Sequence, residues 1–249
     1  MASVAEDRSA PRVETERLPR FLRGPQMWRE GRVWREYFAL TRDPVFYGRG
    51  FPRGSGQPVL LIPGFMAGDI TLNVMSDWLQ RLGYAPQPAG IRVNIHNSEL
   101  LLAGLRRRLL NHYLPTRSRV TVIGHSRGGL LAKVLADRHP QLVERVIALG
   151  SPLTNPFDIH PLTMASVQAA RLINFLRHPL TVEERFLGDL AAAPAVPTTS
   201  IYTRSDGVVN WRACVRPDVT CIEVDGCHIG LAVNREVYRV LARLLPGRF

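Results

Sequence analysis

Residues 119–140 constrain the fold of this chain more than any other stretch of its sequence. They begin with a β-branched run at residues 120–123, which suits a strand buried on both faces. A Gly-x-Ser-x-Gly pattern centred on Ser126 follows this run. Leucine, valine and alanine then recur at helical spacing as far as Ala136. The stretch therefore predicts a strand, a sharp turn and a helix.

The turn around Ser126 is expected to hold the serine in strained backbone space, with its hydroxyl exposed at the N-terminus of the helix. Only glycine fits at Gly124 and Gly128, because a Cβ there would collide with the neighbouring strand and helix. The helix dipole and its free N–H groups favour negative charge at this place. A Gly-x-Ser-x-Gly pattern alone also occurs in ordinary glycine-rich loops, but the flanking strand and helix favour a catalytic serine.

A serine hydroxyl needs a base within hydrogen-bonding reach before it becomes a good nucleophile. Of the seven histidines, His228 is the best placed, since it follows the last predicted strand, lies in a glycine-rich turn and precedes a helix. We expect His125 to pack under the turn of Ser126, because neighbouring side chains there point to different sides. The remaining histidines are expected on the surface or in the lid: His96, His112, His139, His160 and His178.

A carboxylate must orient the imidazole and stabilise its charged form. Asp206 follows the strand predicted to end at Thr203, at the sheet edge where ligand sites of α/β proteins lie. An ordinary Asp-Gly turn is the competing interpretation. Asp225 is the rival acid, but it lies only three residues before His228, whereas the acid usually reaches across from a separate loop. We predict Asp206 as the acid.

These features and their order resemble the serine α/β-hydrolases of the bacterial lipase and esterase kind. Besides the turn of Ser126, the resemblance rests on residues 62–65 (IPGF), 149–152 (LGSP), 205–209 (SDGVV) and 226–231 (GCHIGL). It covers about residues 58–245 and follows the chain order Ser, Asp, His that these enzymes use. It implies an α/β-hydrolase fold: a mostly parallel central sheet, helices on both faces and a small helical lid.

The same resemblance implies an oxyanion hole made of two backbone N–H groups. One belongs to Arg127, the residue after the serine. The other belongs to Phe65, with Met66 as the neighbouring candidate, and both residues are also expected to bind substrate. Arg127 departs from the small or apolar residue often found at its position. Its side chain is expected either to contact an acidic group of the substrate or to face solvent.

The chain divides into an N-terminal extension at residues 1–50 and a hydrolase domain at residues 51–249. Residues 1–22 combine charge, proline and serine, which is typical of disordered or loosely attached segments. Residues 26–41 predict an amphipathic helix whose aromatic face we expect to pack on the core: Trp28, Trp34, Tyr37, Phe38 and Leu40. Contact with a membrane surface, or shielding of the pocket, is the alternative for this helix.

Further strands are predicted at residues 59–62, 84–93, 143–149, 198–203 and 219–224, and further helices at 69–82, 98–113 and 234–245, the first with Asp69 as N-cap. The alternation of strands and helices implies a parallel sheet. It breaks at residues 152–196, where helices at 162–177 and 181–190 predict a lid. Its apolar residues are expected to face the pocket: Leu162, Met164, Val167, Leu172, Ile173, Phe175 and Leu176.

Composition excludes several classes of protein. The net charge of +11 would attract anionic surfaces non-specifically, but the arginines are spread along the chain and no nucleic-acid motif is found. No apolar run approaches the roughly 18 residues of a membrane span, and the charged N-terminus does not resemble a signal peptide. Three cysteines suit a reducing cytosol, with Cys214 and Cys221 expected as free thiols. We expect a cytoplasmic enzyme without a metal or cofactor.

The reaction we infer from the sequence is hydrolysis of a carboxylic ester through an acyl-enzyme on Ser126, with His228 as base and Asp206 as acid. A medium-chain ester or lipid is the expected substrate, and a peptide is less suitable, since nothing indicates an extended groove. Two alternatives stay open. An alcohol could replace water as acyl acceptor, which would make the protein an acyltransferase, or the fold could be catalytically silent and serve binding alone.

Overall fold

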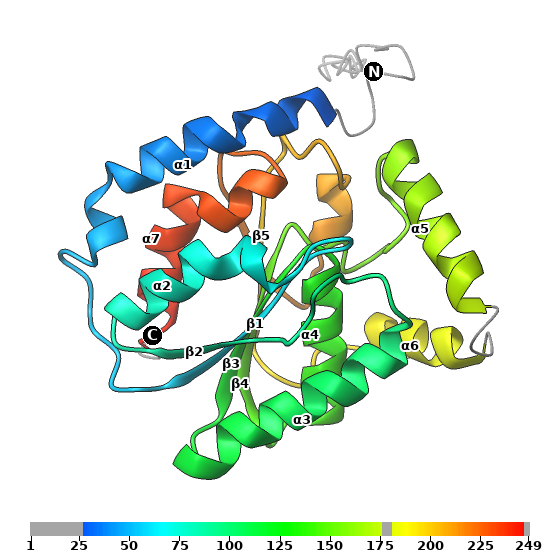
Figure 1. Cartoon of the computed structure of the whole chain (residues 1–249), viewed down its shortest axis with the longest axis horizontal. Coiled ribbons are helices and arrows are strands. Elements are labelled where there is room, and N and C mark those ends of the chain that lie inside the picture. Colours follow the sequence, from blue (N-terminus) through cyan, green and yellow to red (C-terminus); the bar gives the residue numbers. More distant parts are fainter. Residues whose placement is uncertain (1–26, 176–180, 247–249) are drawn as a thin grey trace, which may run out of the picture.

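The computed structural model describes residues 27–175 and 181–246 of the 249-residue chain. The predictions for residues 1–22, His178 and Leu176 therefore lie outside the described residues. A six-stranded sheet forms the centre of the protein, and all neighbouring strands in it run parallel (Figure 1). Its strands are β1 (Pro58–Ile62), β2 (Ala85–Pro88), β3 (Val120–His125), β4 (Val143–Leu149), β5 (Thr198–Tyr202) and β6 (Thr220–Glu223).

The strands lie side by side in the order β2-β1-β3-β4-β5-β6. From β1 the chain first moves outward to β2 and then returns past β1 to β3, so the winding direction reverses between β1 and β3. Ligands of open α/β sheets bind at such a switch point, beyond the carboxyl ends of the strands. The segments that follow β1 and β3 are those of Phe65 and Ser126.

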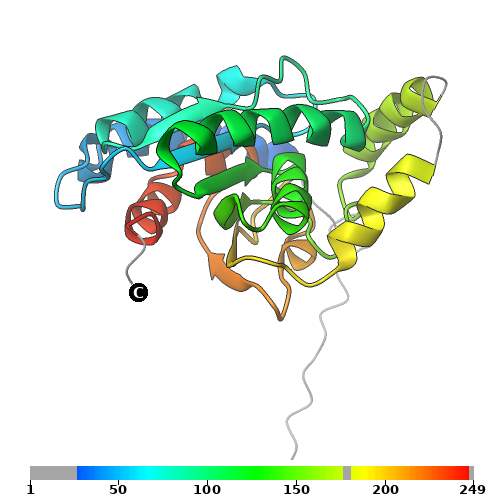
Figure 2. The same cartoon turned by 90° about the horizontal axis from the view of Figure 1, so that it is seen from below.

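Helices cover both faces of the sheet (Figures 1 and 2). Leu60 and Ile62 of β1 point into one core cluster, and Val59 and Leu61 point into the other, as the two-residue period of a strand requires. Helices α3, α4 and α6 complete the first cluster, and α1, α2 and α7 complete the second. The helices are α1 (Val33–Thr41), α2 (Asn73–Arg81), α3 (Ser98–Thr116), α4 (Arg127–Arg138), α5 (Pro161–Phe175), α6 (Thr181–Ala191) and α7 (Arg235–Leu244).

Short 3₁₀-helices precede or follow several of these elements: η2 (Met27–Arg32), η3 (Pro44–Tyr47), η4 (Asp69–Leu72), η5 (Trp211–Cys214) and η6 (Ile229–Val233). The chain is thus an α/β protein with a parallel sheet between two helical layers, as its sequence predicted.

The N-terminal segment buries two carboxylates and exposes most of the aromatic residues that we expected in the core. We call η2 and α1 together the N-terminal strap, residues 27–41. Trp28 and Trp34 are 71% and 69% exposed, and Phe38 is also exposed, whereas Glu30 and Glu36 are each only 7% exposed. The prediction that this face packs on the core is therefore wrong for Trp28, Trp34 and Phe38, and it is confirmed for Leu40, which is fully buried in the second core cluster. The buried carboxylates accept hydrogen bonds from the two loops that follow β5 and β6, which offsets the cost of their burial.

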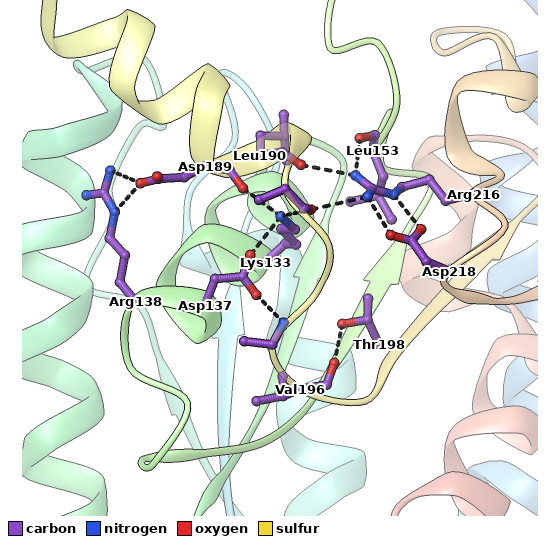
Figure 3. Close-up of polar contacts among 12 residues, drawn as sticks. Lys133, Asp137, Arg138, Leu153, Asp189, Leu190, Val196, Thr198, Arg216 and Asp218 are labelled. Carbon is purple, nitrogen blue, oxygen red and sulfur yellow. Dashed lines mark hydrogen bonds and ion pairs between the residues drawn. The ribbon is translucent and has the colours of Figure 1, made fainter.

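Helices α5 and α6 lie in the predicted insertion at residues 152–196 and stand beside one another at one end of the molecule (Figure 2). The C-terminal end of α6 is fastened to α4 (Figure 3). The ammonium of Lys133, a buried residue of α4, donates to the carbonyls of Asp189 and Ala192 at 2.6 Å each. Arg138 binds the Asp189 carboxylate at 2.6 Å, and Arg216 donates to the Leu190 carbonyl at 3.1 Å.

Three local predictions need correction. Asp69 does not cap a helix, because it is the first residue of η4 and its carboxylate accepts from the N–H groups of Gly90 and Ile91. The strand predicted at 84–93 is short and ends at Pro88, since the following loop turns away to meet Asp69. His112 is buried at 6% exposure rather than on the surface, and burial lowers its pKa.

Candidate active site

Ser126 lies in the sharp turn between β3 and α4. Its backbone has φ 53° and ψ −122°, a strained conformation that few non-glycine residues adopt. A Cβ on Gly124 would collide with the backbone of Gly128, and one on Gly128 would collide with the carbonyl oxygen of Ile62. The expected strain and glycine requirement are both confirmed. The serine therefore lies at the N-terminus of α4, where backbone N–H groups favour negative charge.

His228 and Asp206 meet beside this turn. His228 Nδ1 and Asp206 Oδ2 lie 2.7 Å apart, and the two side chains are 4% and 1% exposed. The other Asp206 oxygen accepts from the N–H groups of Val208 at 2.8 Å and Val209 at 2.6 Å. A carboxylate can only accept, so in its hydrogen bond with Asp206 the proton belongs on Nδ1 of the imidazole.

The charge state of His228 is set by opposing effects. Burial is the largest effect and disfavours the charged ring, but Asp206 and Glu30 together outweigh it and raise the pKa of His228 above its ordinary value. A Cβ on Gly150, which follows β4, would lie 3.1 Å from His228 Nδ1. The glycine there lets the backbone approach the imidazole closely.

His125 packs against His228, as expected for a residue under the turn of Ser126. Its ring lies 4.9 Å from that of His228, and its Nε2 lies 2.9 Å from the carbonyl oxygen of His228. Since a carbonyl can only accept, Nε2 of His125 carries a proton. Burial and the neighbouring His228 lower the pKa of His125 to about 4, so this ring is neutral at physiological pH.

The rival acid is turned away from the imidazole. The carboxylate of Asp225 is 73% exposed and forms an ion pair with Arg32 of the strap at 3.0 Å. Among the two carboxylates weighed from the sequence, only Asp206 contacts His228.

The turn after β1 packs against Ser126. A Cβ on Gly64 would lie 3.2 Å from Ser126 Cβ, which brings the neighbouring Phe65 to the same place. The backbone N–H of Met66 donates to the Asn94 carbonyl at 3.1 Å and is therefore occupied. Of the two candidate oxyanion donors in this turn, the geometry favours Phe65.

The Arg127 side chain is half-buried and bound to a neighbouring loop, rather than simply facing solvent. Its guanidinium donates to the Asn94 amide oxygen at 3.0 Å, to the His96 carbonyl at 2.7 Å and to the Ser98 hydroxyl at 3.2 Å. It thereby fastens the loop at residues 94–98, which borders the site, to the N-terminus of α4. Asn94 in turn donates to the Pro63 carbonyl at 2.8 Å and supports the turn of Phe65.

A cavity of about 140 Å³ opens at Ser126. Phe65 and Arg127 line it, whereas Met66 is 60% exposed and is not among the described residues around it. Helices α5 and α6 contribute four apolar side chains to its wall: Val167, Ala170, Phe186 and Leu187. Their polar side chains at the cavity are those of Thr163, Arg171 and Asn174.

The face of α5 toward the cavity is not the one we expected. Among its predicted pocket residues whose side chains the structure describes, Val167 lines the cavity and Met164 does not, while Leu162, Leu172 and Ile173 are 65%, 63% and 54% exposed. The helix is rotated so that residues three and four apart, 163, 167, 170 and 174, point inward. The side chains of Phe175 and Leu176 lie outside the described residues.

The described residues contain no group of three or more histidine, cysteine, aspartate or glutamate side chains that could hold a metal ion. None of their helices is both long and apolar enough to cross a bilayer. All three cysteines are free thiols, including Cys214 and Cys221.

Sequence reasoning missed Glu30. Its carboxylate accepts from the backbone N–H of His228 and from that of Gly207, next to Asp206. A glutamate among arginines looks like a solvated residue in the sequence.

Comparison with known proteins shows what this chain is similar to in fold. Residues 96–183 match the family described as PGAP1-like alpha/beta domain. No protein with curated annotation matches the chain. A lipase from Bacillus licheniformis in mature form is structurally similar, with a TM-score of 0.55 and 15% identity over 79% of this chain and 94% of the lipase.

Two more solved structures are similar at the level of fold. Polyneuridine aldehyde esterase has a TM-score of 0.53 and 18% identity over 76% of this chain and 99% of its own. An alpha/beta hydrolase from a metagenome of sediments from the lagoon of Mar Chica, Morocco, has a TM-score of 0.52 and 19% identity over 78% of this chain and 90% of its own. With its parallel sheet, its strained serine turn and these neighbours, the chain is an α/β-hydrolase by fold.

Proposed function

We propose that the protein is a serine hydrolase that cleaves carboxylic esters through an acyl-enzyme on Ser126. The observation that carries this proposal is the buried contact of 2.7 Å between His228 Nδ1 and Asp206 Oδ2 beside a serine held at φ 53°. With Nδ1 engaged by the carboxylate, Nε2 of His228 is the nitrogen left to act as a base.

In the proposed reaction, Ser126 Oγ attacks the ester carbonyl while His228 Nε2 accepts the hydroxyl proton. The resulting imidazolium is stabilised by Asp206, and the negative oxygen of the tetrahedral intermediate receives hydrogen bonds from the backbone N–H groups of Phe65 and Arg127. His228 then gives its proton to the leaving alcohol. A water molecule activated by the same imidazole hydrolyses the acyl-enzyme and restores the serine.

The cavity supports an apolar acyl group as the part of the substrate bound next to Ser126. Its walls come from Phe65, from Val167 and Ala170 of α5, and from Phe186 and Leu187 of α6. Apolar surface of this kind stabilises a hydrocarbon chain roughly in proportion to the area buried. Medium-chain esters or lipids are therefore the proposed substrates, and water is the proposed acyl acceptor.

The test is hydrolysis of nitrophenyl esters, from acetyl to palmitoyl, by the wild type and by Ser126→Ala. We expect turnover with an optimum at medium chain length, and none above background in Ser126→Ala. Addition of a competing alcohol, with analysis of the products, shows whether an acyltransferase reaction takes place instead. Absence of turnover with every ester in a folded wild type would contradict the proposal.

A further inference from the structure

The N-terminal strap places a buried carboxylate between the two loops that carry Asp206 and His228. Glu30 Oε1 accepts from the backbone N–H of Gly207, next to Asp206, at 2.9 Å, and from the backbone N–H of His228 at 3.0 Å. Its second oxygen accepts from the N–H of Ile229 at 2.7 Å. One oxygen atom thus joins both loops.

Glu36, six residues further along the strap in α1, binds the segment around His228 and not the loop of Asp206 in the described structure. Its carboxylate accepts from the Cys227 N–H and from the Asn234 side chain, both at 2.8 Å. The loop is shaped to admit it: a Cβ on Gly226 would lie 2.9 Å from a Glu36 oxygen, and one on Gly230 would collide with the same oxygen. The two glycines on either side of His228 therefore leave the space that the Glu36 carboxylate occupies.

We propose that Glu30 is a positioning residue for the reaction, holding the loop of His228 against the loop of Asp206 so that the two side chains keep their contact. This inference rests on the proposed serine hydrolase function. A hydrogen bond from a backbone N–H to an ionised carboxylate is stronger than one to a neutral acceptor, and Glu30 receives three of them.

Glu30 also contributes to the electrostatics of the imidazole. Among the described residues, the charged or titratable groups around His228 are Asp206 after β5, His125 at the end of β3, and Glu30 and Glu36 on the strap. The neighbouring Cys227 thiol is also buried there, and its burial raises its pKa. Asp206 and Glu30 both raise the pKa of His228, against the effect of burial. Removing the charge of Glu30 should therefore make the imidazole easier to deprotonate.

The main test compares Glu30→Gln with Glu36→Gln as a matched control, since both carboxylates are equally buried on the same strap. We expect Glu30→Gln to lower kcat by about tenfold or more while KM stays close to the wild-type value. Its acid limb of kcat/KM against pH should move to lower pH. Glu36→Gln should lower the melting temperature to a similar extent but leave the acid limb where it is.

Glu30→Asp separates the effect of side-chain length from the effect of the negative charge. The shorter carboxylate keeps its charge but cannot span both loops, so the acid limb should stay near that of the wild type while kcat falls. This variant also replaces Glu30→Gln if the glutamine does not fold. Wild-type kcat in Glu30→Asp or in Glu30→Gln would overturn the proposal.

A measurement without turnover separates this proposal from the proposed function. NMR titration of the His228 ring in Ser126→Ala should give a lower pKa after Glu30→Gln than before it. An unchanged pKa and unchanged ring signals would overturn the role of Glu30, even in an active enzyme. A wild type that hydrolyses no ester would overturn the function instead, and the NMR titration would still decide what Glu30 does.

Discussion

His125 Nε2 lies 2.9 Å from the backbone carbonyl oxygen of His228, so a neutral, buried imidazole supports the candidate base from beneath. Three elements distant in sequence thus meet at His228: His125 from β3, Asp206 from the loop after β5, and Glu30 from the N-terminal strap. The site is held by hydrogen bonds to backbone as well as by the contact between the two side chains.

The low pKa of His125 predicts a particular acid instability. A base whose pKa is about 4 in the folded state and about 6.5 in the unfolded state binds more protons when unfolded between these values. The free energy of unfolding should therefore fall as pH drops from about 6.5 to about 4. Urea unfolding of the wild type and His125→Gln across this range checks the prediction. Because glutamine does not titrate, the free energy of unfolding of His125→Gln should change less with pH than that of the wild type. An equal dependence on pH in the two proteins would contradict the assignment.

Replacement by asparagine should have opposite effects on kcat at Asp206 and at Asp225. Asp206→Asn should lower kcat by about 10⁴-fold. The amide oxygen is needed by the N–H groups of Val208 and Val209, so the amide NH₂ would face Nδ1 and hold the imidazole in the wrong tautomer. Asp225→Asn is the control, since this carboxylate is exposed and pairs with Arg32 at 3.0 Å instead of with His228. It should keep nearly wild-type kcat in the nitrophenyl ester assay. Equal loss in both variants, or loss only in Asp225→Asn, would contradict the assignment.

The glycines of the serine turn predict strong and selective sensitivity to alanine. Gly128→Ala should destabilise the protein by about 2–3 kcal/mol or more, because the new Cβ would meet the rigid carbonyl oxygen of Ile62. Gly104→Ala in α3 is the matched control, since its Cβ would meet nothing within 4 Å. It should stabilise by about 0.5–1 kcal/mol through the higher helix propensity of alanine. Chemical denaturation measures both, and similar effects would contradict the described turn.

Lys133 of α4 anchors the C-terminal end of α6, and its replacement should lower the free energy of unfolding. Its ammonium pairs with Asp137 at 2.7 Å and has a side-chain exposure of 2%, and it also binds two carbonyls of the α6 end (Figure 3). Lys133→Met should cost about 3 kcal/mol or more, since these acceptors stay behind without their partner. Arg119→Met breaks an exposed pair with Glu144, also 2.7 Å long, and should cost at most about 1 kcal/mol. Comparable losses in urea unfolding would contradict the anchor.

The sheet and the serine turn were predictable because their signals are local. A strand buried on both faces must be rich in β-branched residues, and the close approaches at Gly124 and Gly128 admit no side chain. His228 and Asp206 could be paired only with the help of the family resemblance, since they come from separate loops.

The strap could not be predicted because its energetics depend on distant partners. Hydropathy assigns Trp34 to the core and Glu30 to solvent, yet Glu30 is buried and Trp34 is 69% exposed. The deciding interactions are backbone N–H groups at residues 207, 228 and 229, far along the chain. A carboxylate that receives three such bonds can be buried, and no local pattern reveals it.

The inner face of α5 was missed for a related reason. The helix has apolar residues around most of its circumference, so periodicity alone does not say which face is inside. Its rotation is set by neighbours such as Ile95, whose carbonyl accepts from the Asn174 side chain at 2.7 Å. Thr163 and Asn174 consequently line the cavity, while Leu172 is exposed.

Labelling with a serine-directed fluorophosphonate, with the modified residue located by mass spectrometry, tests the central claim most directly. It needs no knowledge of the natural ester and reads out the activation of Ser126 by His228 and Asp206. The account predicts a stoichiometric adduct on Ser126 in the wild type, much slower labelling in Asp206→Asn, and none in Ser126→Ala. A folded wild type without an adduct on Ser126, or one labelled as fast after Asp206→Asn, would contradict it.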